Sequence, residues 1–203
     1  MSNSLPFEFG APTSVPHVLE VLYGARLVKL TRYSQETGDD AVKNMDYRMC
    51  PITSRDVFAY TAGPLLMELD SGIRVVGGSD DTDWGSVILR FDRDVKGNET
   101  PKYSLVEDSD YHPIDACDKV YSDLGACSLV GLRILSIVVL QGRKLITRPQ
   151  WPCEVAMRLI MDNDNELVLC HGLRDGGSDE FSVRTKSRIP AGYFEGLKEV
   201  YRR

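Results

Sequence analysis

Histidine is the side chain best suited to act as an acid or a base near neutral pH, and this sequence of 203 residues contains three. His17 falls in a predicted helix, where a structural role is expected. His112 precedes a proline in a polar connecting segment, and His171 ends an apolar run that predicts a strand. The G-x-S-x-G and H-E-x-x-H motifs of hydrolases are absent from the sequence. A small hydrolase or transferase that uses His112 or His171 with a nearby carboxylate is one hypothesis, although no catalytic set is identified.

Two acidic segments point to a different chemistry, that of a binding surface. Their acidic residues are Asp80, Asp81 and Asp83 in the first segment, and Asp175, Asp179 and Glu180 in the second. Trp84 lies within the first segment, and Phe181 follows the second. An aromatic side chain can anchor an interface, and carboxylates attract and pair with Arg or Lys. We therefore predict that the six acids and Trp84 bind a basic protein. In the alternative interpretation, both aromatic residues point into the core and the acids solvate turns.

Neither a metal nor a cofactor is predicted. Asp162, Asp164 and Glu166 alternate as oxygen ligands of Ca²⁺ would, but the glycine and the bidentate glutamate that complete an EF-hand loop are missing. Acidic residues at this spacing are typical of a hairpin turn. Cys170 and His171 are adjacent in a predicted strand, so their side chains would point to opposite faces, and no C-x-x-C pair occurs.

The composition is that of a folded protein without an affinity for nucleic acid. Hydrophobic residues make up 42% of the sequence, and the formal net charge of −6 opposes the phosphate neutralisation that drives non-specific DNA binding. We recognise neither a secretory signal nor an apolar stretch of the roughly 20 residues that span a bilayer. The five cysteines are therefore expected to be free thiols. We expect a cytoplasmic protein with no membrane contact, whose oligomeric state the sequence leaves open.

The segments that must position these residues occur in two similar copies. Residues 65–91 and 155–184 each contain two apolar runs joined by an acidic turn, followed by an acidic, glycine-rich segment and a third apolar run. The sharpest correspondence is that of GARL at 24–27 with GLRI at 131–134. A polar stretch at 34–56 is predicted to be a loop. Repetition of this kind predicts two units with the same elements.

The repeated pattern predicts an α+β protein. Each unit would contain a helix, a strand that begins near the shared arginine, and a three-stranded antiparallel meander. We place the units at residues 1–111 and 112–203, packed as one compact protein that could form a single domain. A hairpin turn is predicted at Asp70–Gly72, where glycine supplies a positive φ. The helix of the second unit is predicted at 116–124, and apolar residues at helical spacing predict a C-terminal helix over 189–201.

One part of the second unit resembles a known class of proteins. In GLRILSIVVL at 131–140 and RPQWPCEVAMRLIMDNDNELVLCHGLRDGGSDEFSV at 148–183, a Gly-x-Arg-Ile strand is followed by a long loop, a hairpin and an acidic loop. This arrangement resembles that of bacterial immunity proteins from polymorphic-toxin and contact-dependent growth inhibition systems. The resemblance implies a small acidic cytoplasmic α+β protein that binds and blocks a cognate toxin domain, often a basic nuclease. Its motifs are structural and imply no catalytic residue.

Our leading hypothesis is a non-enzymatic immunity protein that blocks a cognate cationic toxin domain, with a nuclease as the expected target. Its acidic segments would mimic the nucleic-acid backbone. An enzyme would instead have a pocket that brings His112 or His171 within hydrogen-bonding reach of an Asp or Glu. A third hypothesis is an adaptor that binds another strand through an exposed, uncharged sheet edge.

Overall fold

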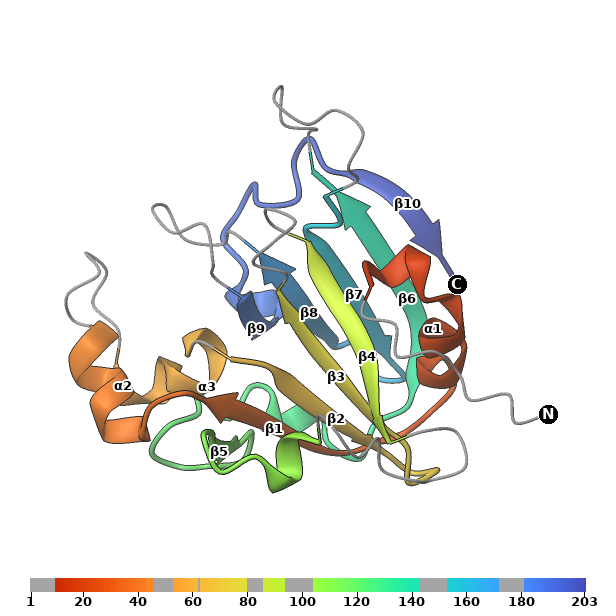
Figure 1. The fold of residues 1–203 in the computed structure, drawn as a ribbon. Coiled ribbons are helices and arrows are strands. Elements are labelled where there is room, and N and C mark those ends of the chain that lie inside the picture. Colours follow the sequence, from red (N-terminus) through yellow and green to blue (C-terminus); the bar gives the residue numbers. More distant parts are fainter. Residues whose placement is uncertain are drawn as a thin grey trace.

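The computed structural model shows an α+β fold made mainly of antiparallel sheet (Figure 1), which confirms the predicted fold class. The residues that the structure describes are 10–45, 53–61, 63–79, 86–93, 104–142, 153–171 and 181–203. Within these ranges the chain forms two five-stranded sheets, together with short α-helices and 3-10 helices.

The strands of the first sheet lie in the order β4-β3-β2-β1-β5, and those of the second in the order β10-β6-β7-β8-β9. The first sheet consists of β1 (Leu27–Ser34), β2 (Leu65–Leu69), β3 (Arg74–Ser79), β4 (Val87–Arg93) and β5 (His112–Asp115). The second consists of β6 (Ile134–Gln141), β7 (Ala156–Met161), β8 (Glu166–His171), β9 (Phe181–Thr185) and β10 (Lys198–Arg202). The helices are α1 (Pro16–Leu22), α2 (Gly38–Met45) and α3 (Val57–Tyr60), with 3-10 helices η1 (Pro12–Ser14), η2 (Ser54–Asp56), η3 (Leu105–Glu107), η4 (Cys127–Leu129) and η5 (Lys186–Arg188).

Tight hairpins join the central strands of both sheets. The turn between β2 and β3 contains Gly72 at φ +80°, which confirms the predicted hairpin. In the turn between β7 and β8, Asp164 adopts φ +63°, and the N–H of Met161 donates to the carbonyl of Asn165 at 2.8 Å. The acidic residues there serve the turn, because Asp tolerates this left-handed conformation better than most residues.

The two sheets share one pattern of strand connections. In each, the first strand pairs with the second and also with a later edge strand: β1 with β2 and β5, and β6 with β7 and β10. The β1–β2 pairing begins at Leu27 and Leu69, the β6–β7 pairing begins at Ile134 and Met161, and both registers shift after the first pair. Leu27 therefore corresponds to Ile134, and the positions that follow correspond in step.

The GARL and GLRI segments meet where β1 and β6 begin. Each glycine donates its backbone N–H to a carbonyl of the other segment, at 2.9 Å for Gly24 and 2.7 Å for Gly131. Both glycines have positive φ, +79° and +90°. Arg26 and Arg133 form an isolated bridge, and each guanidinium donates to the carbonyl of the other segment's glycine. The match seen in the sequence is thus a reciprocal contact that links the two sheets at one corner.

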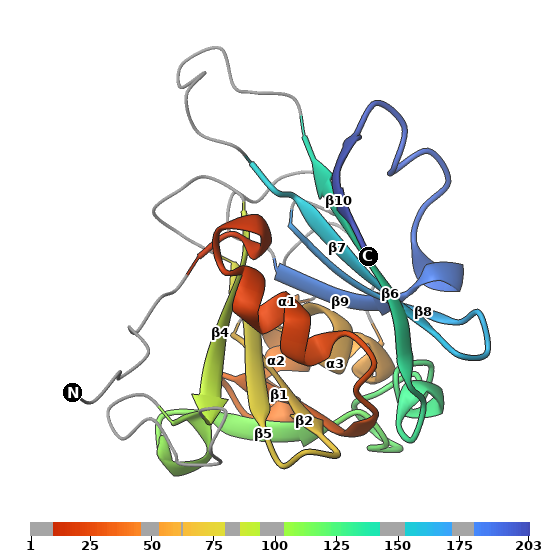
Figure 2. The ribbon, with the colours of Figure 1, turned by 90° about the vertical axis from the view of Figure 1, so that its right-hand side faces the viewer.

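The two sheets enclose one hydrophobic core. Its buried residues include Leu30 and Leu89 from the first sheet, and Leu159 and Leu169 from the second. Figure 2 shows α1 lying across the opening between β4 and the second sheet, where Leu19 of α1 is fully buried in the same core. The two halves of the chain therefore bury their apolar faces against each other rather than in separate cores.

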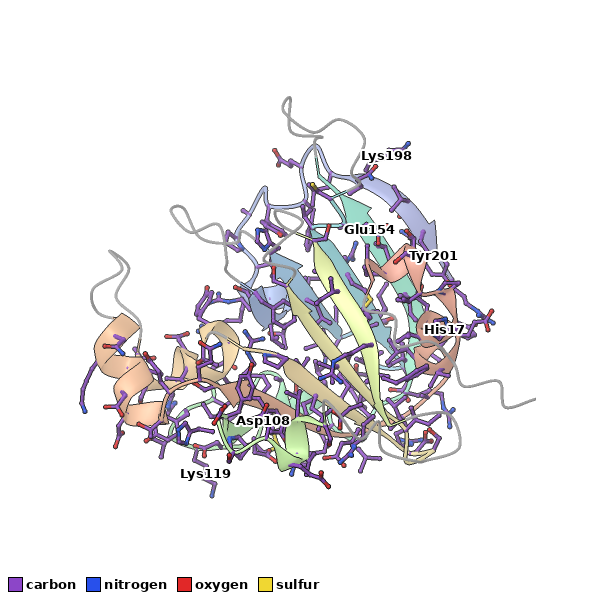
Figure 3. The ribbon with its side chains drawn as sticks, viewed as in Figure 1. His17, Asp108, Lys119, Glu154, Lys198 and Tyr201 are labelled. Carbon is purple, nitrogen blue, oxygen red and sulfur yellow. A yellow bond between two sulfur atoms is a disulfide. The ribbon has the colours of Figure 1, made fainter. Side chains whose placement is uncertain are left out.

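The predicted C-terminal helix is wrong, because Lys198–Arg202 form β10 instead, paired with β6. Gly192 and Gly196 adopt φ +83° and +78° and break the preceding segment into turns. The helical spacing of its apolar residues arises because they serve two surfaces. Those of the turns pack on the outer face of the second sheet, whereas Tyr201 of β10, labelled in Figure 3, packs against the main core. The backbone groups along the edge of β6 need partners, and β10 supplies them.

The helix predicted at 116–124 is also absent, so the second sheet is not preceded by a helix as the first is. Turns and η4 occupy this region, closed by a disulfide between Cys117 and Cys127 with Cα atoms 4.7 Å apart. The expectation of free thiols is wrong for this pair, whose proximity depends on how the turns fold. Cys153 and Cys170 are buried free thiols, as expected, and the fifth cysteine lies outside the described residues.

Two further elements depart from the sequence interpretation. The stretch predicted to be a loop contains α2, which begins after a local cap: the Thr37 hydroxyl accepts the N–H of Asp40 at 3.2 Å and donates to its carboxylate at 2.7 Å. This T-x-x-D pattern is a helix-start signal that we missed. Strand β5 follows the proposed division at residues 111 and 112, yet it pairs with β1 and completes the first sheet.

Candidate functional site

The seven residues predicted to bind a basic partner lie outside the part of the chain that the structure describes. They are Asp80, Asp81, Asp83, Trp84, Asp175, Asp179 and Glu180. The structure does place the strands that flank them, since the first acidic segment connects β3 to β4 and the second connects β8 to β9. The candidate site is built from the ends of these strands.

The two acidic segments begin side by side. Ser79 is the last residue of β3 and His171 is the last residue of β8, and these positions are equivalent in the two sheets. A hydrogen bond of 2.6 Å joins Ser79 Oγ and His171 Nδ1. Both side chains face the core side, because their cross-strand neighbours, Val87 and Phe181, belong to the main core. The fold thus joins residues 92 positions apart and brings the starts of both segments to one end of the molecule.

A third segment ends at the same place. Glu154, labelled in Figure 3, accepts the N–H of Val87 at its carbonyl at 2.9 Å and donates its own N–H to Ser86 Oγ at 3.2 Å. Ser86 follows the first acidic segment. Residues 143–152, which precede Glu154 closely, contain three bases and no acid in sequence. The bases are Arg143, Lys144 and Arg148. The residue pair Glu154 and Ser86 therefore joins the end of a basic segment to the end of the first acidic segment.

A buried arginine lies beneath this end of the sheets. Arg32 is 0% exposed, and its cross-strand neighbours, Leu65 and Ile114, both belong to the main core. Its Nη2 donates to the carbonyls of Thr61 and Phe181, both at 2.6 Å. The guanidinium carbon lies 4.5 Å from the centre of the Phe181 ring, a cation–π contact. Nε and Nη1 have no hydrogen-bond partner in the described structure.

Two hydroxyl groups accompany Arg32. Ser34 Oγ and Thr61 Oγ1 lie 2.6 Å apart, and both residues are buried. Burial lowers the pKa of Arg32 to about 9, which leaves the guanidinium charged at neutral pH. Sequence reasoning missed this site, although the alternation of Leu30, Arg32 and Ser34 places all three on one face of β1. Phe181 is only 4% exposed, so it is a core residue and not an exposed anchor.

Cys170 is not available as a nucleophile. Burial raises the pKa of its thiol to about 12, so the thiol stays protonated at neutral pH, and only a thiolate attacks readily. Its neighbour Tyr193 donates its hydroxyl to the carbonyl of His171 at 3.0 Å and is held protonated because burial raises its pKa. The hydrogen bond from Tyr193 holds the end of β8 in place.

Comparisons with known proteins returned no significant match. This holds for protein-family models, for curated proteins and for solved structures. Among the described residues, no helix is long and apolar enough to cross a membrane.

The histidines differ in what surrounds them. His112 is exposed on the edge strand β5, and the His17 ring lies 5.6 Å from that of Phe91. His171 is half-buried and bonded to Ser79, so it is the histidine with a possible nucleophile beside it. Within the described ranges, no group of three His, Cys, Asp or Glu side chains could hold a metal ion.

Two of the described sheet edges are protected against pairing with another strand. Edge strand β10 carries Lys198, Glu199 and Arg202, and charged side chains discourage edge-to-edge association. Edge strand β5 contains Pro113, which has no N–H to donate. Neither edge has the exposed, uncharged character that the adaptor hypothesis requires.

Proposed function

We propose that this protein is a non-enzymatic inhibitor of the immunity-protein type, which binds and blocks a cationic toxin domain, with a nuclease as the expected target. The hydrogen bond between Ser79 and His171 carries the proposal, because it joins the starts of two segments that each contain three acidic residues. Sequence alone gave two separate acidic stretches. Their common origin at one end of the fold makes a single anionic surface possible.

Such a surface would act by attraction and occlusion. Carboxylates clustered on one side of a protein raise the rate at which a cationic partner arrives, and Trp84 would supply apolar area at the contact. A nuclease groove that binds phosphates would accept carboxylates in their place. The formal net charge of −6 favours this encounter over binding to nucleic acid itself.

The test compares charge variants in their binding to the product of the adjacent gene, which this proposal expects to contain a cationic toxin domain. Neutralising the first segment with Asp80→Asn, Asp81→Asn and Asp83→Asn should slow association at low salt about tenfold and weaken inhibition of the toxin. Neutralising the bases of the third segment, Arg143, Lys144 and Arg148, should have the opposite sign and speed association. Stopped-flow kinetics and a nuclease assay measure both effects.

A matched control removes the same charge elsewhere. Glu107→Gln with Asp108→Asn and Asp110→Asn changes three exposed acids, and Figure 3 shows Asp108 far from Glu154. If the control slows association as much as the first variant does, net charge and not the acidic segment governs the encounter. If no variant changes the rate and the toxin stays active, the proposed function fails.

The same proposal places the protein in the cytoplasm, where the fold must be stable without its disulfide. Thiols are kept reduced in the cytoplasm of most cells, yet Cys117 and Cys127 form a disulfide here. The proposed role therefore requires the dithiol form to stay folded and inhibitory. An inhibition assay in excess reductant checks this, and loss of inhibition would contradict the cytoplasmic assignment.

A second candidate, a small hydrolase, is favoured by the same hydrogen bond. Ser79 would be the nucleophile and His171 its base, since the pair lies within proton-transfer distance. Wild-type protein would then hydrolyse a nitrophenyl ester, and Ser79→Ala and His171→Asn would each lower the rate by about 100-fold or more. Turnover at the rate of free imidazole, unaffected by Ser79→Ala, would eliminate this candidate.

A further inference from the structure

The fold does not require a charge at the position of Arg32. In the corresponding place of the second sheet, the interior residue is Val139: Arg32 pairs with Leu65 of β2, and Val139 pairs with Met157 of β7. Val139 is fully buried in the main core and packs there as an ordinary apolar residue. The same backbone pattern therefore accepts a hydrophobic side chain, and an arginine in this environment needs another explanation.

Among the described residues, no carboxylate pairs with Arg32. Two carbonyls accept hydrogen bonds from Nη2, but a carbonyl carries no net charge. Nε and Nη1 have no hydrogen-bond partner in the described structure. Besides burial, the pKa of Arg32 is affected by the Cys170 thiol, and burial keeps that thiol protonated and therefore neutral. Buried charges are as a rule paired or bound to an ion.

Two other buried charges in the described chain follow that rule. Asp92 has Arg74 and Arg90 within 3.5 Å, and Glu166 has Arg158 and Lys186 at 2.7 Å. The Glu154 carboxylate has neutral partners instead, since it accepts the N–H of Thr13 at 2.9 Å and also its hydroxyl. Arg32 differs from all three acids because two of its charged nitrogens have no hydrogen-bond partner in the described structure.

The groups around Arg32 suit an anionic oxygen. Nε and Nη1 are charged donors. In the Ser34–Thr61 hydroxyl pair one hydroxyl donates to the other, and the second hydroxyl can donate its proton to a further acceptor. Phe181 covers one face of the guanidinium, so an anion would approach in the guanidinium plane. All four residues are at most 4% exposed, so a hydrogen bond to an anion at this place would be shielded from water.

We propose that Arg32, with the hydroxyls of Ser34 and Thr61, forms a binding site for a small oxyanion, namely a carboxylate, phosphate or sulfate group. Its oxygens would occupy the free N–H groups and neutralise the buried charge. The site lies under the end of the sheets where Ser79 and His171 meet, because His171 pairs with Phe181. The proposal stands independently of the toxin-inhibitor function.

The first test is thermal unfolding in sodium acetate, phosphate, sulfate and chloride at matched ionic strength. Binding to the native state raises the melting temperature with the logarithm of ligand concentration, so at least one oxyanion should raise the wild-type value by several degrees over chloride. In Arg32→Met this rise should be lost, and only the general stabilisation that phosphate and sulfate give any protein should remain. Arg202→Met, which changes an exposed arginine, should respond as wild type does and controls for the loss of an arginine charge.

Which oxyanion acts separates the possible sources of the ligand. A response to acetate alone indicates a carboxylate, and a response to phosphate or sulfate indicates a tetrahedral oxyanion. Equal melting temperatures in all four salts, or an unchanged response in Arg32→Met, would overturn the proposal.

A second measurement needs no variant and so remains decisive if Arg32→Met fails to fold. In protein labelled with nitrogen-15 at arginine, the Nε–H of a fully buried guanidinium is protected from exchange with water and gives a resolved signal. Titration with the active oxyanion should shift this signal along a saturable curve, while the signals of exposed arginines move little. A signal that does not move, or that moves linearly with salt as the others do, would show that no anion reaches Arg32.

Discussion

The first and second sheets have the same strand order, the same hairpins and the same register shift after the first residue pair, yet different side chains fill equivalent positions. Gly24 and Gly131 match in conformation and in the hydrogen bonds they make. Arg32 and Val139 occupy equivalent positions but differ in charge and polarity. Ser79 and His171 also occupy equivalent positions, and their different side chains are hydrogen-bonded to each other. The matching glycines stabilise the backbone that both sheets share. The difference between Arg32 and Val139 shows that this backbone does not require a charged residue at that position.

The outer faces of the two sheets also differ, because the ion clusters on them are buried to different extents. On the first sheet, the Asp92 carboxylate is 0% exposed between Arg74 and Arg90 and also accepts the N–H of Leu105 at 2.9 Å. On the second sheet, Glu166 is paired with Lys186, whose side chain is 58% exposed. Each sheet buries an acid between two bases, but only the first seals its ion cluster from water.

The largest effect is expected from opening the sealed cluster. Asp92→Ala leaves two buried guanidinium groups without their anion, and we expect it to lower the free energy of unfolding by about 3–5 kcal/mol. Glu166→Ala should cost less, about 1.5–3 kcal/mol, because water can reach Lys186. Urea denaturation measures both. Equal losses would show that the two clusters are buried alike, and Asp40→Ala, at an exposed ion pair, should have the smallest effect of the three.

The segments that precede β1 and β6 provide the next test. The first is helical, whereas the second is closed by the Cys117–Cys127 disulfide over a separation of 10 residues. Replacing both cysteines by serine should lower the free energy of unfolding by about 2–3 kcal/mol, mainly because the unfolded chain gains freedom. Reductant should destabilise wild type by a similar amount and leave the double variant unchanged. A protein that unfolds on reduction would show that this loop holds its sheet together.

The reciprocal glycines should respond alike. Gly24→Ala and Gly131→Ala place a Cβ where no atom lies within 4 Å, so the cost is that of positive φ alone, about 1–2 kcal/mol for each. Gly78→Ala in β3 is the control, since its added Cβ meets only ordinary van der Waals contacts with Ile88 and Pro64, and it should be close to neutral. Thermal unfolding of the three variants makes the comparison. A large difference between the first two would mean that only one of the equivalent turns supports the corner.

The smallest expected effect is the change in stability at acidic pH that depends on the Glu166 carboxylate. Burial acts to raise the pKa of Glu166, but hydrogen bonds from Arg158 and Lys186 outweigh it, and the pKa is lowered. A carboxyl whose folded-state pKa is lowered contributes stability above its unfolded pKa of about 4.3, and this contribution is lost as the pH falls through the folded value. Glu166→Gln should therefore be less stable than wild type at pH 7, and the gap should narrow below about pH 4. Urea midpoints across this range measure it, and a constant gap would contradict the assigned ion pair.

Much of the fold was visible in the sequence because its signals are local. The Asp70–Gly72 hairpin, the alternating strands of the two meanders and the GARL–GLRI match each depend on neighbouring residues and on the freedom of glycine at positive φ. The four residues GGSD occur at 77–80 and again at 176–179, but these positions do not correspond in the fold. Gly77 and Ser79 lie within β3, whereas the second occurrence follows the end of β8, so the strand positions that correspond are Ser79 and His171.

Only the tertiary structure decided the rest, because each of these features depends on what distant segments bring. The last segment became β10 since β6 offered an unpaired edge, and Cys117 met Cys127 through the fold of the intervening turns. The starts of the acidic segments met because two sheets pack around one core. Arg32 is an ordinary polar position in an alternating strand until the second sheet covers it. The sequence by itself indicated the hairpins and the strands they join, because these depend on neighbouring residues. Packing determined the edge strands β5 and β10, which charges are buried, and which loops begin together.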